Sequence, residues 1–333
     1  INKADAQSPM LIFPHRYHTM KALEWVCAQS SNWKPAYYKA LVLWGWLQND
    51  RAKAILDSIP KADYAPFYLT RARLKEGANR LDDLKQAERL QSSWRTGLAL
   101  TEYYLSTHDY ANAESTARKY LKKYPENYII GLKYAKTLCL EGKYDQCSRY
   151  MKTLDVLPNE GAQEGHVVYK TAHLGFAISL IQKGQWDKAQ EEVEQSYSYP
   201  ENLGVGKPFE RYDDQRVSNF LSARIAESRG DQAKAKALYK KVTDHKPGRR
   251  MRSTDVLNVL ALRAIGQTAE ADSIAAKWKA ESSDLARWAN AVCKGDYAAA
   301  AKAASVIRQP KNGAVWENTW QDPDFDILQI LFR

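Results

Sequence analysis

The chain has 333 residues, of which 44% are hydrophobic and 26% are charged. These fractions exclude a wholly disordered chain, and no apolar run approaches the roughly 20 residues that a membrane-spanning helix needs. The 49 basic and 39 acidic residues give a formal charge of +10, which is spread over both halves of the sequence. A nucleic-acid binder usually concentrates its basic residues in one stripe or module. We therefore expect no nucleic-acid partner and no membrane insertion.

The N-terminal part of the chain predicts a tail followed by a helix. Residues 1–9 show no helical pattern and are expected to form the tail. Residues 10–29 place Met20, Leu23 and Trp25 at helical spacing, which predicts a helix that pairs with the next one, over 37–48.

A six-residue phrase then recurs along the chain. It begins with glycine, asparagine or histidine and ends with a small residue in seven clear copies, which start at Asn49, His108, Gly142, Gly184, Gly230, Gly266 and Gly295. A degenerate eighth copy starts at Asn79. Glycine or asparagine suits a helix that ends in a left-handed residue, and a small sixth residue lets a second helix approach the first. Each phrase therefore predicts the turn of a helical hairpin.

The spacing of the phrases indicates the kind of repeat. Successive copies start 30, 29, 34, 42, 46, 36 and 29 residues apart, and the middle value is the period of a tetratricopeptide repeat. Inserted loops at 158–165 and 200–211 account for the two longest intervals. Stacked hairpins share one continuous core. We predict an all-α, right-handed superhelical solenoid of about eight or nine tetratricopeptide-like hairpins, which spans 10–333 as one unit.

The C-terminal segment is too apolar for an exposed tail. It contains Trp316, Trp320, Phe325, Ile327 and Leu328. We expect Pro323–Phe332 to form a final helix that caps the last groove.

Several phrases are more specific than the general repeat pattern: Leu11-Ile-Phe-Pro14, Trp33-Lys-Pro-Ala-Tyr-Tyr38, Ala65-Pro-Phe-Tyr-Leu69 and Tyr199-Pro-Glu-Asn-Leu-Gly-Val-Gly-Lys-Pro208. Together they resemble the C-terminal helical-repeat region of large bacterial proteins that begin with a domain of unknown function. That N-terminal domain is similar to the β-sandwiches of galactose-mutarotase-like sugar-processing proteins. The resemblance covers roughly residues 10–330, although His15-Arg16-Tyr17 departs from the family's pattern. It implies that this chain is a fragment, whose catalytic or sugar-binding site lies in the absent part.

Motifs of known chemistry are missing from the sequence. There is no nucleotide, zinc-protease or hydrolase motif, and the four cysteines lack the spacing of a zinc site. Cys139 and Cys147 are expected to approach each other, as two buried thiols in preference to a disulfide. Gly204-Val-Gly206 is interpreted as a structured connection and not as a phosphate loop. We therefore expect no cofactor, no metal and no catalytic residue.

Two charged segments have both a purely structural and a functional interpretation. The alternating Asp322, Asp324 and Asp326 suit a helix N-terminus better than a calcium loop. The basic cluster between Lys240 and Arg252 is expected to be a solvated helix end, with anion binding as the alternative.

The repeat register predicts a binding groove. The first helix of each hairpin lines the concave side of such arrays, and we count back from the small sixth residue to find the positions that face it. One position receives Lys39, Leu98, Leu132, Leu174 and Phe220, and the other receives Leu43, Glu102, Lys136, Ile178 and Arg224. From these and their neighbours we predict six partner-binding residues: Lys39, Trp46, Arg95, Glu102, Lys136 and Arg224. A mixed apolar and basic groove suits an amphipathic or acidic segment.

The sequence thus predicts a non-catalytic scaffold. Its partner is expected to be a protein or peptide, with the N-terminal domain of the same polypeptide as one candidate. The alternative is an accessory glycan-binding region of a sugar-processing enzyme whose catalytic domain is absent here. Because the chain does not begin with methionine, we assign no compartment.

Overall fold

The computed structural model describes residues 1–160, 162–209, 213–245, 251–307, 322 and 324–333. Every regular element in these residues is a helix, which confirms the predicted all-α class. Residue contacts divide the chain into two compact units, Ile1–Lys133 and Tyr134–Arg333. The two units are described separately.

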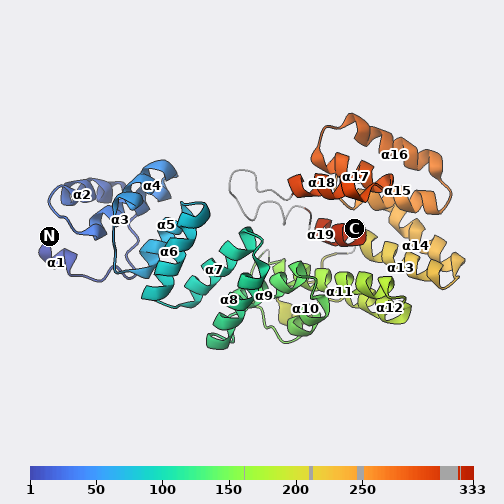
Figure 1. Ribbon diagram of the computed structural model, residues 1–333, viewed down its shortest axis with the longest axis horizontal. Coiled ribbons are helices and arrows are strands. Elements are labelled where there is room, and N and C mark those ends of the chain that lie inside the picture. Colours follow the sequence, from blue (N-terminus) through green and yellow to red (C-terminus); the bar gives the residue numbers. More distant parts are fainter. Residues whose placement is uncertain (161, 210–212, 246–250, 308–321, 323) are drawn as a thin grey trace. The chain divides into compact units, whose positions relative to one another are not determined.

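The first unit contains three helical hairpins and an N-terminal helix that packs on them (Figure 1). Its helices are α1 (Asn2–Asp5), α2 (Tyr17–Cys27), α3 (Trp33–Gly45), α4 (Asn49–Ser58), α5 (Ala65–Arg73), α6 (Gly77–Leu90), α7 (Trp94–Ser106) and α8 (Tyr110–Lys123). Helix α2 packs against α3, as the sequence predicts, and α3–α4, α5–α6 and α7–α8 form the hairpins. The boundary between the units falls inside α9 (Tyr128–Leu140).

The expected tail is tied to the first unit. Residues 2–5 form the short helix α1, and Ser30 Oγ donates a hydrogen bond of 2.8 Å to Asp5 Oδ2. The Lys34 ammonium donates to the carbonyl oxygens of Asp5, at 2.6 Å, and of Gln7, at 2.7 Å. These contacts hold residues 5–7 at the start of α3.

The second unit continues the series of hairpins. Its helices are α10 (Tyr144–Met151), α11 (Glu164–Gln182), α12 (Trp186–Gln195), α13 (Arg216–Ser228), α14 (Gln232–Asp244), α15 (Asp255–Ala264), α16 (Thr268–Ala280), α17 (Asp284–Cys293), α18 (Tyr297–Ile307) and α19 (Phe325–Leu331), with one 3₁₀ turn, η1 (Glu201–Leu203). Helices α9 to α18 pair in order as five hairpins. The described residues therefore hold eight hairpins in all, within the predicted number.

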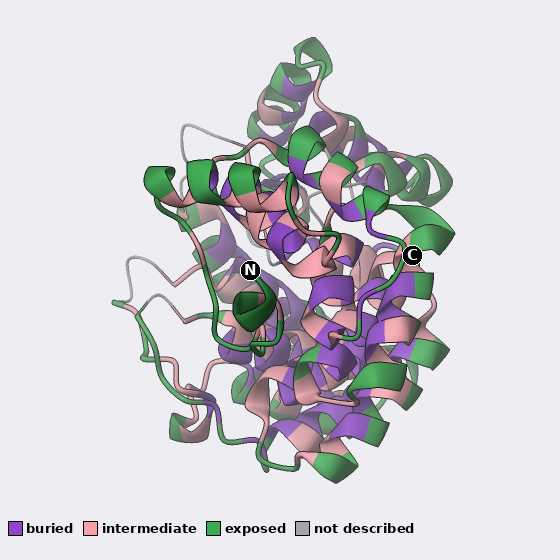
Figure 2. Ribbon diagram, turned by 90° about the vertical axis from the view of Figure 1, so that its left-hand side faces the viewer, coloured by how far each residue is buried: buried purple, intermediate pink, exposed green. Residues whose placement is uncertain are grey.

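The recurring phrase forms the turn of the hairpins, as predicted. Its first residue has a positive φ at Gly142, Gly184, Gly230, Gly266 and Gly295, and also at His108. Its sixth residue is almost fully buried: Ala113, Cys147, Ala189, Ala235, Ala271 and Ala300 are at most 2% exposed. Figure 2 shows that buried positions lie between neighbouring helices and exposed positions on their outer faces.

The predicted positions of two copies of the phrase are wrong. In the first hairpin the left-handed residue is Leu47, with φ 60°, and the buried small residue is Ala52, whereas Ala54 is exposed. This copy therefore starts two residues before Asn49. The degenerate copy is also displaced, because Asn79 lies inside α6 and not at a turn.

Helix α19 packs on more than the last hairpin. The Phe325 ring meets Trp288 of α17 edge-on, with ring centroids 5.0 Å apart, and Phe332 stacks on Tyr297 at 6.4 Å. The same helix contacts α11, three hairpins earlier (Figure 1). The predicted final helix is thus present and reaches further than predicted. Trp316, Trp320 and Pro323 lie outside the described residues.

The paired cysteines are buried and free. The Cys139 thiol donates to Cys147 Sγ across 3.3 Å, and Cys147 Sγ in turn donates to the Ala135 carbonyl oxygen at 3.2 Å. Their contact places α10 directly against α9.

Candidate functional site

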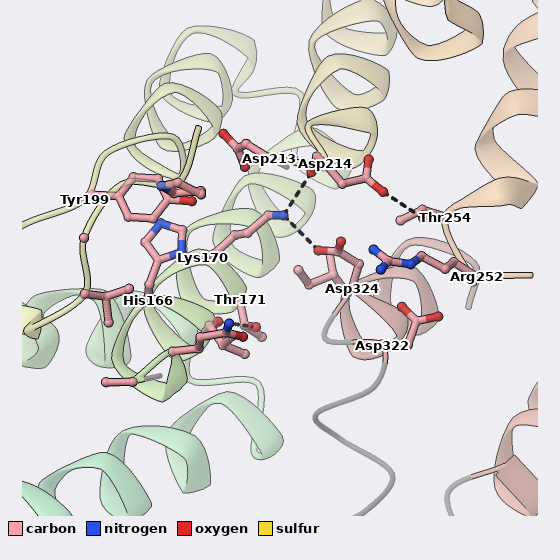
Figure 3. Close-up of a pocket in the computed structure, with 17 residues that line it drawn as sticks. His166, Lys170, Thr171, Tyr199, Asp213, Asp214, Arg252, Thr254, Asp322 and Asp324 are labelled. Atoms are coloured by element: carbon pink, nitrogen blue, oxygen red, sulfur yellow. Dashed lines mark hydrogen bonds and ion pairs between the residues drawn. The ribbon is translucent and has the colours of Figure 1, made fainter. Parts of the chain in front are cut away.

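The second unit contains a polar pocket of about 460 Å³. Its walls are the first turns of α11, the segment between α12 and α13, the entry to α15 and the start of α19 (Figure 3). Its charged and aromatic lining comprises His166, Lys170, Tyr199, Asp213, Asp214, Arg252, Asp322 and Asp324.

The two inserted loops of the sequence build one side of the pocket. Asn202 Nδ2 donates to the carbonyl oxygens of Met151, at 3.0 Å, and Leu154, at 2.9 Å. Gly204 lies so close to the segment leading into the first loop that a Cβ atom there would be 2.6 Å from the Val156 carbonyl oxygen. Its φ of 63° also favours glycine. The prediction of a structured connection at this glycine is therefore confirmed.

Lys170 occupies the centre of the pocket. Its ammonium lies 3.0 Å from Asp324 Oδ1 and donates to the Asp214 carbonyl oxygen at 3.4 Å. Burial by itself would lower the pKa of Lys170, but Asp324, Asp214 and Asp213 raise it above its usual value. Lys170 is therefore protonated at neutral pH and is not suited to act as a nucleophile.

His166 and Tyr199 form an aromatic plate on one wall. Their rings stack with centroids 3.7 Å apart and planes 6° apart, and His166 Nε2 lies 3.1 Å from the Ser198 carbonyl oxygen, to which it donates. Burial and the nearby Lys170 lower the pKa of His166 to about 4. Burial and the Asp213 carboxylate raise the pKa of Tyr199 to about 12. Both rings are therefore uncharged at neutral pH.

A buried arginine fixes the far wall of the pocket. The Arg216 side chain is 2% exposed and donates through Nε and Nη2 to Asp214, at 2.9 and 2.7 Å. It also donates to Asp255 Oδ1 at 2.7 Å, Asn258 Oδ1 at 2.8 Å and Thr254 Oγ1 at 2.6 Å. All five N–H groups of the guanidinium are thereby satisfied. Burial alone would raise the pKa of Asp214, but its bonds to Arg216 lower it to about 2.

The described residues contain no group of three or more His, Cys, Asp or Glu side chains that is able to hold a metal ion. No helix among them has the length and hydrophobicity to cross a bilayer.

The six predicted groove residues lie on first helices or at their ends, four in the first unit and two in the second. In the first unit, Trp46 stacks on Tyr17 at 6.1 Å, and the exposed Arg95 guanidinium lies over the Trp94 ring at 4.4 Å. Glu102 Oε1 is 3.8 Å from Lys133 Nζ. Lys39 is half-buried on α3.

In the second unit, Lys136 is half-buried on α9. Arg224 is exposed on α13, with its Nε 3.7 Å from Glu227 Oε2.

The register behind these residues needs correction. Because the first phrase starts two residues earlier, Tyr37 and not Lys39 is equivalent to Leu98 and Leu132. Four of the five residues at that position belong to the core, since Tyr37, Leu132, Leu174 and Phe220 are at most 5% exposed, whereas Leu98 is half-buried. The other position reaches the surface at Glu102, Lys136 and Arg224, whereas Ile178 is 2% exposed.

The sequence analysis does not predict this pocket. Its residues lie between 162 and 327 and belong to no motif. The available signal was the two insertions, because insertions into a repeat tend to gather on one face, which is often the binding face.

No protein-family model and no curated protein matches this sequence. Among solved structures, a chain in the structure of Naa15/Naa10 bound to HypK-THB is similar, with a TM-score of 0.45 and 16% sequence identity. The similarity covers 94% of this chain and 51% of that chain, so this chain spans about half of its length. A likeness this distant carries no functional inference.

Proposed function

We propose that this chain is a non-catalytic helical-repeat scaffold that binds a protein partner along its first helices. The observation that carries the proposal is the seating of α19, an amphipathic helix that packs against the first helices α11 and α17. Its residues Phe325, Ile327 and Leu328 are at most 7% exposed. The same kind of surface, on other repeats, suits an amphipathic helix of a partner.

The charges around α19 indicate which partner helix fits. Asp322 accepts hydrogen bonds from the Ser253 amide at 2.6 Å and from its hydroxyl at 2.7 Å, and Asp324 pairs with Lys170 at 3.0 Å. Acidic residues thus precede the apolar face of the helix that is bound here. A partner segment with the same order, acidic residues followed by an apolar helical face, matches the exposed Arg95 and Arg224 on other first helices.

A crosslinking experiment tests the scaffold proposal. A photo-reactive residue at Arg95 or Arg224 is expected to capture one specific protein from cells of the source organism, and Arg95→Glu is expected to weaken binding of that purified protein by at least about tenfold. Lys122→Glu, on the exposed face of the second helix α8, serves as the control. Equal weakening by both charge reversals, or capture by neither position, would contradict the proposal.

The glycan alternative stays a prediction. A glycan array probed with the whole chain, and with Trp46→Ala and Arg224→Ala variants, tests it. If a sugar binds the wild-type chain and this binding is lost in the two variants, the function is glycan binding.

A further inference from the structure

Most charges around the pocket are matched by another group of the protein. Lys170 pairs with Asp324, and Asp214 pairs with Arg216. Asp322 is buried and takes both the amide and the hydroxyl of Ser253. These groups hold the walls together and leave little binding capacity for a ligand.

Two further charges, of opposite sign, have no ion-pair partner among the described residues. Asp213 accepts hydrogen bonds from two neutral donors, the Gln215 amide at 2.8 Å and the Tyr199 hydroxyl. It has no cation within ion-pair distance among the described residues. The exposed Arg252 uses its backbone N–H to bond Asp255 Oδ2 at 3.0 Å. Its guanidinium has no ion-pair partner in the described part of the chain. Figure 3 shows the two on different walls, with Lys170 between them.

This arrangement discriminates between classes of ligand. A phosphate-like anion would meet four aspartates, and a neutral sugar would cover two charges without pairing either, which is costly. A ligand with one ammonium and one carboxylate pairs both and leaves the net charge of the pocket unchanged. The volume of about 460 Å³ falls in the range of roughly 300–1,000 Å³ of small-molecule sites.

We propose that this pocket binds a small zwitterion, an amino acid or a short peptide. The ligand's ammonium pairs with Asp213, and its carboxylate accepts two hydrogen bonds from the Arg252 guanidinium. The plate of His166 and Tyr199, which lines the same pocket, offers an apolar surface to the ligand's side chain. This inference is independent of the scaffold function.

Calorimetric titration of the whole chain tests the ligand class. The probes are the common amino acids and a set of dipeptides, each beside its N-acetylated form, which lacks the ammonium, and its amide, which lacks the carboxylate. At least one zwitterion is expected to bind, and each blocked form at least about tenfold more weakly. Preference for amino acids or for dipeptides identifies the source of the zwitterion. Glucose and inorganic phosphate are titrated in the same way, as probes of the two other ligand classes, neutral sugars and phosphate-like anions.

Matched variants test the site. Arg252→Gln and Asp213→Asn remove one charge each at nearly constant size, and both are expected to weaken binding at least about tenfold. Arg149→Gln changes an exposed arginine of α10 outside the pocket and is expected to bind like the wild type. Circular dichroism confirms that each variant is folded. Failure of every zwitterion to bind, equal binding of glucose or phosphate, or unchanged binding by Arg252→Gln would overturn the proposal.

Discussion

At the scale of single residues, burial and neighbouring charges together set the protonation states of the groups in the pocket. His166 is 9% exposed and its ring stacks on Tyr199, so the charged imidazolium would lose most of its hydration. Lys170, one turn further along α11, stays charged because carboxylates surround it. Burial by itself lowers the pKa of both side chains, and the carboxylates that face Lys170 reverse the direction of its shift.

His166 predicts an acid-dependent loss of stability. Its pKa is about 4 in the folded chain, against an ordinary value of 6.5, so the unfolded chain takes the proton first. The stability that comes from the neutral ring is complete above about pH 6.5 and is lost as the pH falls towards 4, by about 3 kcal/mol at most. In His166→Gln this part of the pH dependence is expected to disappear.

Urea unfolding at several pH values between 7 and 4 measures this effect. The wild type and His166→Gln are compared with His15→Gln, which changes an exposed histidine. If the slopes of the wild type and His166→Gln against pH are the same, the interpretation of His166 is wrong.

At the scale of the elements, close approach between the two helices of a hairpin depends on glycine. A Cβ atom at Gly97 of α7 would lie 2.3 Å from the Tyr120 ring of α8. That ring has no freedom to move away, because its hydroxyl bonds both Glu88, at 2.8 Å, and Ser92, at 3.1 Å. A similar contact joins two successive hairpins of the second unit, where Gly175 of α11 faces the Tyr144 ring of α10.

Gly97→Ala is expected to destabilise the chain by about 1–3 kcal/mol, the usual cost of overpacking. The matched control is Gly45→Ala at the end of α3, where a Cβ atom meets nothing within 4 Å. There the better helix propensity of alanine is expected to leave stability unchanged or slightly raised. Thermal and urea unfolding of both variants check the difference, and equal effects of the two would refute the packing argument.

Helix α19 is stabilised by the side chains that it buries against the rest of the second unit. With seven residues it is too short to be stable alone, so its helical form depends on the surface that receives it. Phe325, Ile327, Leu328 and Phe332 are at most 9% exposed, and each such side chain contributes roughly 1.5–3 kcal/mol when fully buried. Packing, and not propensity, therefore places this element.

At the scale of the whole molecule, the chain combines local repeats with two compact units. In repeat proteins each hairpin is stabilised mainly by its neighbours, so damage to one unit need not unfold the other. Arg216 offers a clean way to test this, because its five hydrogen bonds all lie inside the second unit.

Arg216→Met is expected to destabilise the second unit by about 3–5 kcal/mol, since it leaves Asp214 and Asp255 buried without their cation. Hydrogen exchange followed by mass spectrometry is expected to show faster exchange in α11 to α17 and unchanged exchange in α3 to α7. Arg149→Met, an exposed arginine of the same unit, is the control. Loss of protection throughout α3 to α7 would show that the two units unfold together.

Sequence patterns alone are enough to predict the hairpins and their turns. Turn chemistry is local: a left-handed glycine such as Gly184 and a buried small residue such as Ala189, five residues later, are constraints within a few residues of each other. The predicted register is wrong where this local signal is absent. Leu47 adopts the left-handed conformation without being glycine or asparagine, and so Lys39 was assigned to the wrong register.

The pocket and its unpaired charges arise from contacts between segments that lie far apart in the sequence. Lys170, Asp213, Arg252 and Asp324 come from four separate segments, and no spacing in the sequence relates them. Whether a charge is paired depends on atoms within a few ångströms, which the fold of the inserted loops and of α19 brings together. The two differ because backbone turns depend on residues that are close in sequence, whereas ion pairing and burial depend on residues that are close in space.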